Sequence, residues 1–156
     1  MPTTSINYVA AIVLAFVASL AHADFKVVKV VDGDTIHVMD ADKGTSRVRL
    51  HGIDTPERRQ PYYRKATDAL AAMVAGRQVT LVYQDTDRYG RIVATVLLPD
   101  GTNVNLRMVE QGWAWWYQRY APEDKALQTA QQRAREGRLG LWADENPVAP
   151  WDWRRR

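Results

Sequence analysis

Acidic side chains gather between Asp32 and Glu57, in a stretch whose other charges are mainly basic. Asp34 and Asp54 stand near expected turns and strand ends, where carboxylates can converge on a cation. Calcium takes six to eight oxygen ligands, supplied by carboxylates, backbone carbonyls and water. Two carboxylates and a loop carbonyl would therefore form a partial, water-rich shell with room for a phosphate oxygen.

Two arginines accompany these carboxylates. Arg49 precedes Asp54 by five positions, and Arg91 ends the polar segment 85–91. An arginine can grip a phosphate through two parallel hydrogen bonds. A metal site with paired arginines indicates phosphoryl chemistry.

Each fragment alone also has a purely structural interpretation. A turn of the type Asp32-Gly33-Asp34 is common, and residues 54–57 (DTPE) could begin a helix. In that case Asp54 would cap the helix and Glu57 would complete the capping box. The residues by themselves leave both interpretations open.

The patterning predicts a small domain of strands and helices. Runs of β-branched residues predict strands at 25–31, 35–39, 47–51, 79–83 and 92–98. Apolar residues at helical spacing, with Gly and Pro at the boundaries, predict helices within 61–76, 103–111 and 122–138, the last with Pro122 in its first turn. The segment 146–156, rich in Trp, Arg and Pro, is expected to lie over the surface without a regular element.

The chain from residue 24 onward resembles the staphylococcal nuclease family over nearly its full length. The motifs that carry the resemblance occur in the family's order: 31–35 (VDGDT), 47–50 (RVRL), 52–57 (GIDTPE), 87–91 (DRYGR), 109–114 (VEQGWA), 139–142 (LGLW) and 150–155 (PWDWRR). The resemblance implies an α+β, mainly β fold: a five-stranded OB-like Greek-key barrel with about three packed helices. One nuclease domain is expected over 24–145, followed by a C-terminal tail.

The resemblance also implies a role for individual residues. Asp34 and Asp54 would bind one Ca²⁺ through their carboxylates, Thr55 would add its backbone carbonyl, and Glu57 would orient or deprotonate the attacking water. Arg49 and Arg91 would hold the scissile phosphate. The expected reaction is hydrolysis of DNA and RNA, single strands preferred, to products with 3′-phosphate and 5′-hydroxyl ends, by a monomer.

Substrate-binding residues follow the family less closely. Arg88 stands where the family tends to have Lys before Tyr89, which keeps the charge and changes its geometry. The family's base-stacking tyrosines fall within residues 115–120, where Tyr117 and Tyr120 are the candidates. An aromatic platform of this kind contributes roughly 1–3 kcal/mol per base.

The first 23 residues read as an export signal. Residues 8–20 are almost entirely apolar but short for a membrane span, and Ala21-His22-Ala23 has the pattern of a cleavage site. The segment before them lacks the usual Lys or Arg. We expect cleavage after Ala23 and a secreted or periplasmic protein without stable membrane association. A buried helix and a retained membrane anchor are the alternatives.

The composition excludes only a few classes of function and of metal site. The net charge of +3 is too small to demonstrate a polyanionic partner, and the absence of cysteine excludes disulfides and thiolate metal sites. His37 and His51 are not expected to be ligands, because calcium prefers oxygen. A noncatalytic OB module that binds single-stranded nucleic acid is the main alternative to a nuclease.

Overall fold

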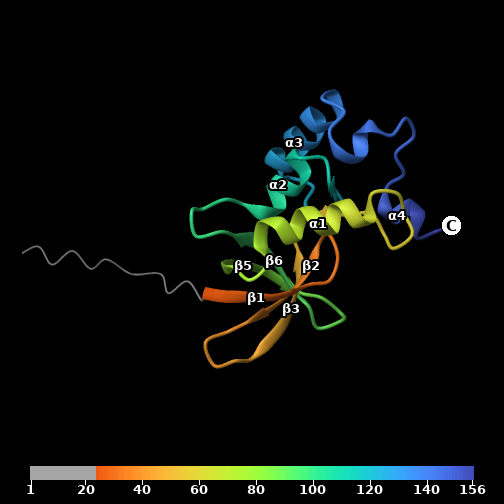
Figure 1. The fold of residues 1–156 in the computed structure, drawn as a ribbon. Coiled ribbons are helices and arrows are strands. Elements are labelled where there is room, and N and C mark those ends of the chain that lie inside the picture. The colour runs from red at the N-terminus through yellow and green to blue at the C-terminus, as the bar shows by residue number, and fades with distance from the viewer. Residues whose placement is uncertain (1–23) are drawn as a thin grey trace, which may run out of the picture.

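Five strands close into a barrel in the computed structural model, which describes residues 24–156 (Figure 1). The strands are β1 (Asp24–Val30), β2 (Thr35–Met39), β3 (Thr45–Leu50), β5 (Gln78–Thr86) and β6 (Ile92–Leu97). Their order around the barrel is β1-β2-β3-β6-β5, with β5 pairing back onto β1. The β3–β6 pair is parallel and the other pairs are antiparallel. This topology confirms the expected OB-like barrel.

The barrel interior is filled by side chains that alternate along the strands. On β2, Ile36 and Val38 are completely buried, and the intervening His37 is not. This period of two is what a strand with one face on a core requires. The helix α1 (Tyr63–Val74) lies across the barrel and adds Leu70 and Val74 to the same core.

The other helices follow the barrel in the chain. They are α2 (Val104–Glu110), α3 (Lys125–Glu136), the 3₁₀ helix η1 (Gly140–Ala143) and α4 (Pro150–Trp153). The prediction that Pro122 lies in the first turn of α3 is wrong, because the Asp124 side chain accepts the Leu127 amide and caps the helix there. Asparagine and aspartate caps satisfy amides that have no partner within the helix.

The segment 146–156 was expected to lack regular structure, and this prediction is wrong. Pro150 opens α4, since its fixed φ suits the first helical position and that position needs no amide donor. Pro150 is buried, and the side-chain amide of Gln60 donates from Nε2 to the Val148 carbonyl at 2.7 Å. The segment is therefore packed against the loop that precedes α1 (Figure 1).

The predicted export signal and its cleavage site after Ala23 lie outside the described residues. Within residues 24–156, no helix has the length and apolar character needed to cross a membrane.

Candidate active site

The register of β2 and β3 brings Asp34 to Arg49. Thr35 lies opposite Arg49 in this antiparallel pair, so the preceding residue, Asp34, sits at the start of β2 beside the Arg49 side chain. The Leu50 amide donates to the Asp34 carbonyl at 2.9 Å. A turn after β3 then leads into the short strand β4 (Ile53–Asp54), which pairs with β7 (Trp115–Trp116).

Arg49 joins the two predicted metal-binding carboxylates. Its Nε lies 3.3 Å from Asp34 Oδ1 and its Nη2 lies 3.0 Å from Asp54 Oδ1. The remaining nitrogen, Nη1, donates to the carbonyls of Leu50 and Ile53 at 2.7 and 2.9 Å. The guanidinium is thus fixed on both sides, and it holds Asp34 and Asp54 close together.

Thr55 holds the other oxygen of Asp34. Its amide and its hydroxyl donate to Asp34 Oδ2 at 2.9 and 2.8 Å. Gly33 leaves room for this contact, because a Cβ there would lie 2.8 Å from Thr55 Oγ1. Thr55 therefore belongs to the site through its amide and its hydroxyl, whereas the sequence predicted its backbone carbonyl as a calcium ligand.

Burial makes these carboxylates electrostatically costly. Asp54 is only 2% exposed, and burial raises its pKa. Burial, followed by repulsion from Asp34, raises the pKa of Asp32 to about 6. Clustered carboxylates of this kind favour a bound cation.

The helix-capping interpretation of residues 54–57 is wrong. Asp54 is part of β4, and α1 begins nine positions later, at Tyr63. The residue preceding α1, Tyr62, makes no side-chain capping bond.

Glu57 is tied to the same site by a residue that the sequence did not single out. Arg154, at the end of α4, donates from Nη2 to Asp54 Oδ2 at 2.8 Å and from Nη1 to Glu57 Oε1. Burial lowers the pKa of Arg154, but the hydrogen bonds to Asp54 and Glu57 outweigh this effect, so that its pKa is raised. Its partners are about 100 positions away, and no local pattern reveals such a contact.

Arg91, Arg88 and Tyr89 form a second group in the loop between β5 and β6. The Asp87 carboxylate accepts Arg91 Nε at 2.7 Å and the Tyr89 amide at 2.9 Å. Both arginines lie over the Tyr89 ring, within 4.9 and 5.6 Å of its centroid. Arg47 on β3 donates to the Tyr89 carbonyl at 2.5 Å, which fixes the loop beside the strand that carries Arg49.

Tyr117 and Tyr120 belong to a third group, which is aromatic. Their rings meet edge to face with centroids 4.8 Å apart. Trp151 of α4 stacks on Tyr117 at 5.0 Å with an interplanar angle of 10°. One face of Tyr117 is therefore occupied by Trp151, while Tyr120 is 60% exposed.

The donors around Asp34 and Asp54 suit a hard cation. Within the described residues, no three or more His, Asp or Glu side chains are grouped so as to hold a metal by themselves. A cation would therefore share the two carboxylates with backbone carbonyls and water, which are ligands that calcium accepts. The guanidinium of Arg154 already places a positive charge on Asp54 and Glu57. The residues fit a calcium ion.

The barrel with its buried paired carboxylates and neighbouring arginines has the features of a protein that binds phosphate groups. Comparison with known proteins narrows this broad class. The staphylococcal nuclease homologue family matches residues 47–144, a range that includes Arg49, Asp54, Thr55, Glu57 and Arg91. An Escherichia coli protein named an uncharacterized endonuclease is 50% identical over 131 residues, which are 84% of each chain.

Two further relatives align over almost the whole length. Protein ParB of Escherichia coli is 45% identical, over 94% of this chain and 88% of its own. A micrococcal nuclease of Shigella flexneri is 40% identical, over 97% of this chain and 92% of its own. The chain belongs to the staphylococcal nuclease family, and it is a nuclease.

Proposed function

We propose that this nuclease is a calcium-dependent phosphodiesterase that hydrolyses DNA and RNA to products with 3′-phosphate and 5′-hydroxyl ends. The observation that carries the proposal is the pair of buried carboxylates, Asp34 and Asp54, held together by one guanidinium. A site of this kind combines a place for a cation with a fixed positive charge.

We assign the predicted metal-binding and catalytic residues the following roles in this reaction. Asp34, Asp54 and Thr55 would hold calcium, which supplies Lewis-acid activation and charge neutralisation when bound. Glu57 would accept a hydrogen bond from the attacking water and orient it, with or without taking its proton. Arg49 and Arg91 would hold the phosphate oxygens on which negative charge grows in the transition state.

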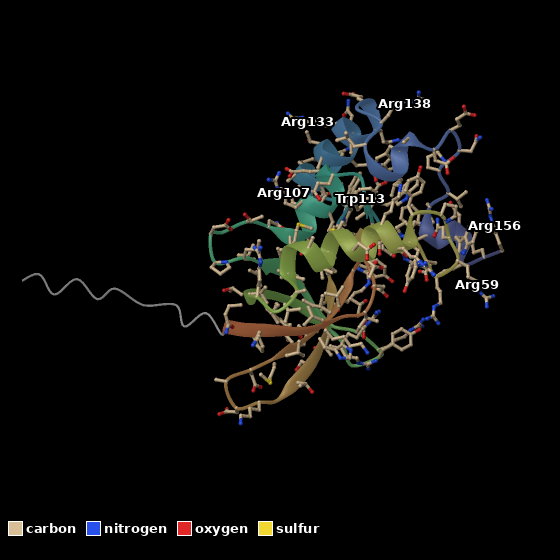
Figure 2. The ribbon with its side chains drawn as sticks, viewed as in Figure 1. Arg59, Arg107, Trp113, Arg133, Arg138 and Arg156 are labelled. Atoms are coloured by element: carbon tan, nitrogen blue, oxygen red, sulfur yellow. The ribbon has the colours of Figure 1, made fainter. Side chains whose placement is uncertain are left out.

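The substrate strand would extend over basic and aromatic side chains beside this centre. Tyr89 is 57% exposed with Arg88 against its ring, so it can stack on a base next to the held phosphate. The residues that follow Glu57 in the chain line a surface hollow, and they include Arg58, Arg59 and Lys65. Figure 2 shows Arg59 and Arg156 pointing outward at the end of the molecule that carries α4. Such side chains suit a flexible single strand.

We also propose that the enzyme is exported and that it acts as a monomer. The apolar run at 8–20 followed by Ala21-His22-Ala23 supports cleavage before Asp24 and a secreted or periplasmic enzyme. Sequencing the amino terminus of the mature protein tests this directly. A start far from Asp24 would contradict export by cleavage at this site.

Digestion of denatured DNA and of RNA tests the reaction itself. Cleavage should require calcium and stop when a chelator is added. Polynucleotide kinase should label the products without prior phosphatase treatment, because their 5′ ends would be hydroxyls. Cleavage that persists in the chelator, or products that need phosphatase first, would contradict the proposal.

A further inference from the structure

Arg154 occupies the carboxylates that calcium would need. Both oxygens of Asp54 accept hydrogen bonds: Oδ2 from Arg154 at 2.8 Å, and Oδ1 from Arg49 at 3.0 Å and from Arg154 at 3.4 Å. Glu57 Oε1 is bonded to Arg154 as well. Calcium binds oxygen at about 2.3–2.6 Å through the lone pairs of the carboxylate. In this structure those lone pairs accept hydrogen bonds from the guanidinium groups. A cation on Asp54 must therefore compete with an arginine.

Arg154 is the arginine that can yield. The Arg49 side chain is 15% exposed and is also bonded to two backbone carbonyls, so its release would leave several polar groups unpaired. The Arg154 side chain is 41% exposed, and among residues 24–156 its hydrogen bonds to other side chains go to Asp54 and Glu57. Its guanidinium can turn into water at much lower cost.

The charges favour the same exchange. Arg154 pairs with both Asp54 and Glu57, so a calcium ion bound to Asp54 would lie close to its guanidinium. Repulsion between the two positive charges favours release of the arginine.

The backbone of α4 need not move for this exchange. The segment is held independently, by the hydrogen bond from Gln60 to the Val148 carbonyl and by the stacking of Trp151 on Tyr117. The side chain of Arg154 can therefore leave the carboxylates while its helix stays in place.

We propose that Arg154 is a displaceable counter-cation of the calcium site, so that the α4 segment lowers the protein's affinity for calcium. Arg154 neutralises Asp54 and Glu57 in the metal-free protein, and calcium binds in exchange for it. This inference rests on the proposed function, because it requires calcium to bind at Asp54.

Calorimetric titration of the metal-free protein with calcium tests the exchange. Arg154→Ala should bind calcium roughly 3- to 30-fold more tightly than the wild type, the range expected for losing a half-exposed, charge-assisted ion pair. Arg155→Ala is the matched control, because its side chain is 75% exposed and, in the part of the chain that the structure describes, forms an ion pair with Asp152 and not with Asp54 or Glu57. Its affinity should equal that of the wild type.

The outcomes separate the two proposals. Calcium binding by the wild type with unchanged or weaker binding by Arg154→Ala overturns the exchange and leaves the proposed function intact. Absence of calcium binding by the folded wild type overturns the proposed function, and the exchange with it. Arg154→Gln, which keeps a side chain of similar shape without the charge, should also bind more tightly, and it serves if Arg154→Ala does not fold.

Discussion

Removing Arg49 should destabilise the metal-free protein, because two buried carboxylates would lose their common partner. A hydrogen bond to a charged group contributes about 1.5–3 kcal/mol, and Arg49 makes one to Asp54 and an ion pair with Asp34. Breaking a buried ion pair by removing one partner costs about 3–5 kcal/mol. Arg154 still pairs with Asp54, and Thr55 still donates to Asp34. We therefore expect a loss near the lower end, about 3 kcal/mol.

Urea denaturation followed by tryptophan fluorescence, with a chelator present, measures this loss. With an m-value of about 2 kcal/mol/M, Arg49→Ala should lower the unfolding midpoint by about 1.5 M. Arg47→Ala is the matched control from the same strand, since Arg47 is exposed and its guanidinium donates to the Tyr89 carbonyl rather than to a carboxylate of the site. Its loss should stay below about 1 kcal/mol. If Arg49→Ala unfolds within about 0.5 kcal/mol of the wild type, the two carboxylates do not depend on Arg49.

Three further perturbations test other parts of the structure. Arg91→Ala should lower turnover of denatured DNA by about 10²–10³-fold with an unchanged unfolding midpoint, and near-normal turnover would refute its role. Because the pKa of Asp32 is raised to about 6, its protonated form stabilises the fold by at most about 3 kcal/mol, and this is lost as pH rises from about 4 to about 6. Asp32→Asn should flatten that decline in denaturation curves, and an unchanged slope would contradict it. Gly112→Ala should lower the free energy of unfolding by more than about 3 kcal/mol, since the new Cβ would lie 2.2 Å from the Leu139 carbonyl oxygen. Gly101→Ala has open space around it and should lower it by about 1 kcal/mol. Equal losses for the two variants in thermal unfolding would show that the close contact at Gly112 does not matter.

Local patterns in the sequence predicted most of the barrel. Strand β2 begins and ends where its β-branched alternation does, at Thr35 and Met39. The alternation works because one face of each strand packs into the core, which gives a period of two. The start of α3 was missed because Pro122 and Asp124 are both acceptable helix openers, and only the observed bond to the Leu127 amide decides between them.

For the site, too, the sequence predicted the residues that are close in the chain and missed the one that is distant. Asp34, Arg49 and Asp54 were predicted from their clustered charges and from the resemblance to the family, and the structure brings them together through one hairpin and one turn within about 20 positions. Arg154 reaches Asp54 from 100 positions away, through the docking of α4. That docking depends on tertiary contacts such as Trp151 on Tyr117, which neither segment encodes alone. It also puts a tryptophan on a ring that we expected to be open to a substrate base.

The cleavage rate of Asp54→Asn tests most directly whether the paired carboxylates form a calcium-dependent nuclease centre. The substitution keeps the shape of a 2% exposed side chain and removes its charge. At saturating calcium, the rate on a single-stranded oligonucleotide should fall by at least about 100-fold. Asp42→Asn, a change in an exposed turn, should cleave like the wild type. Cleavage by Asp54→Asn within about twofold of the wild type would contradict the account.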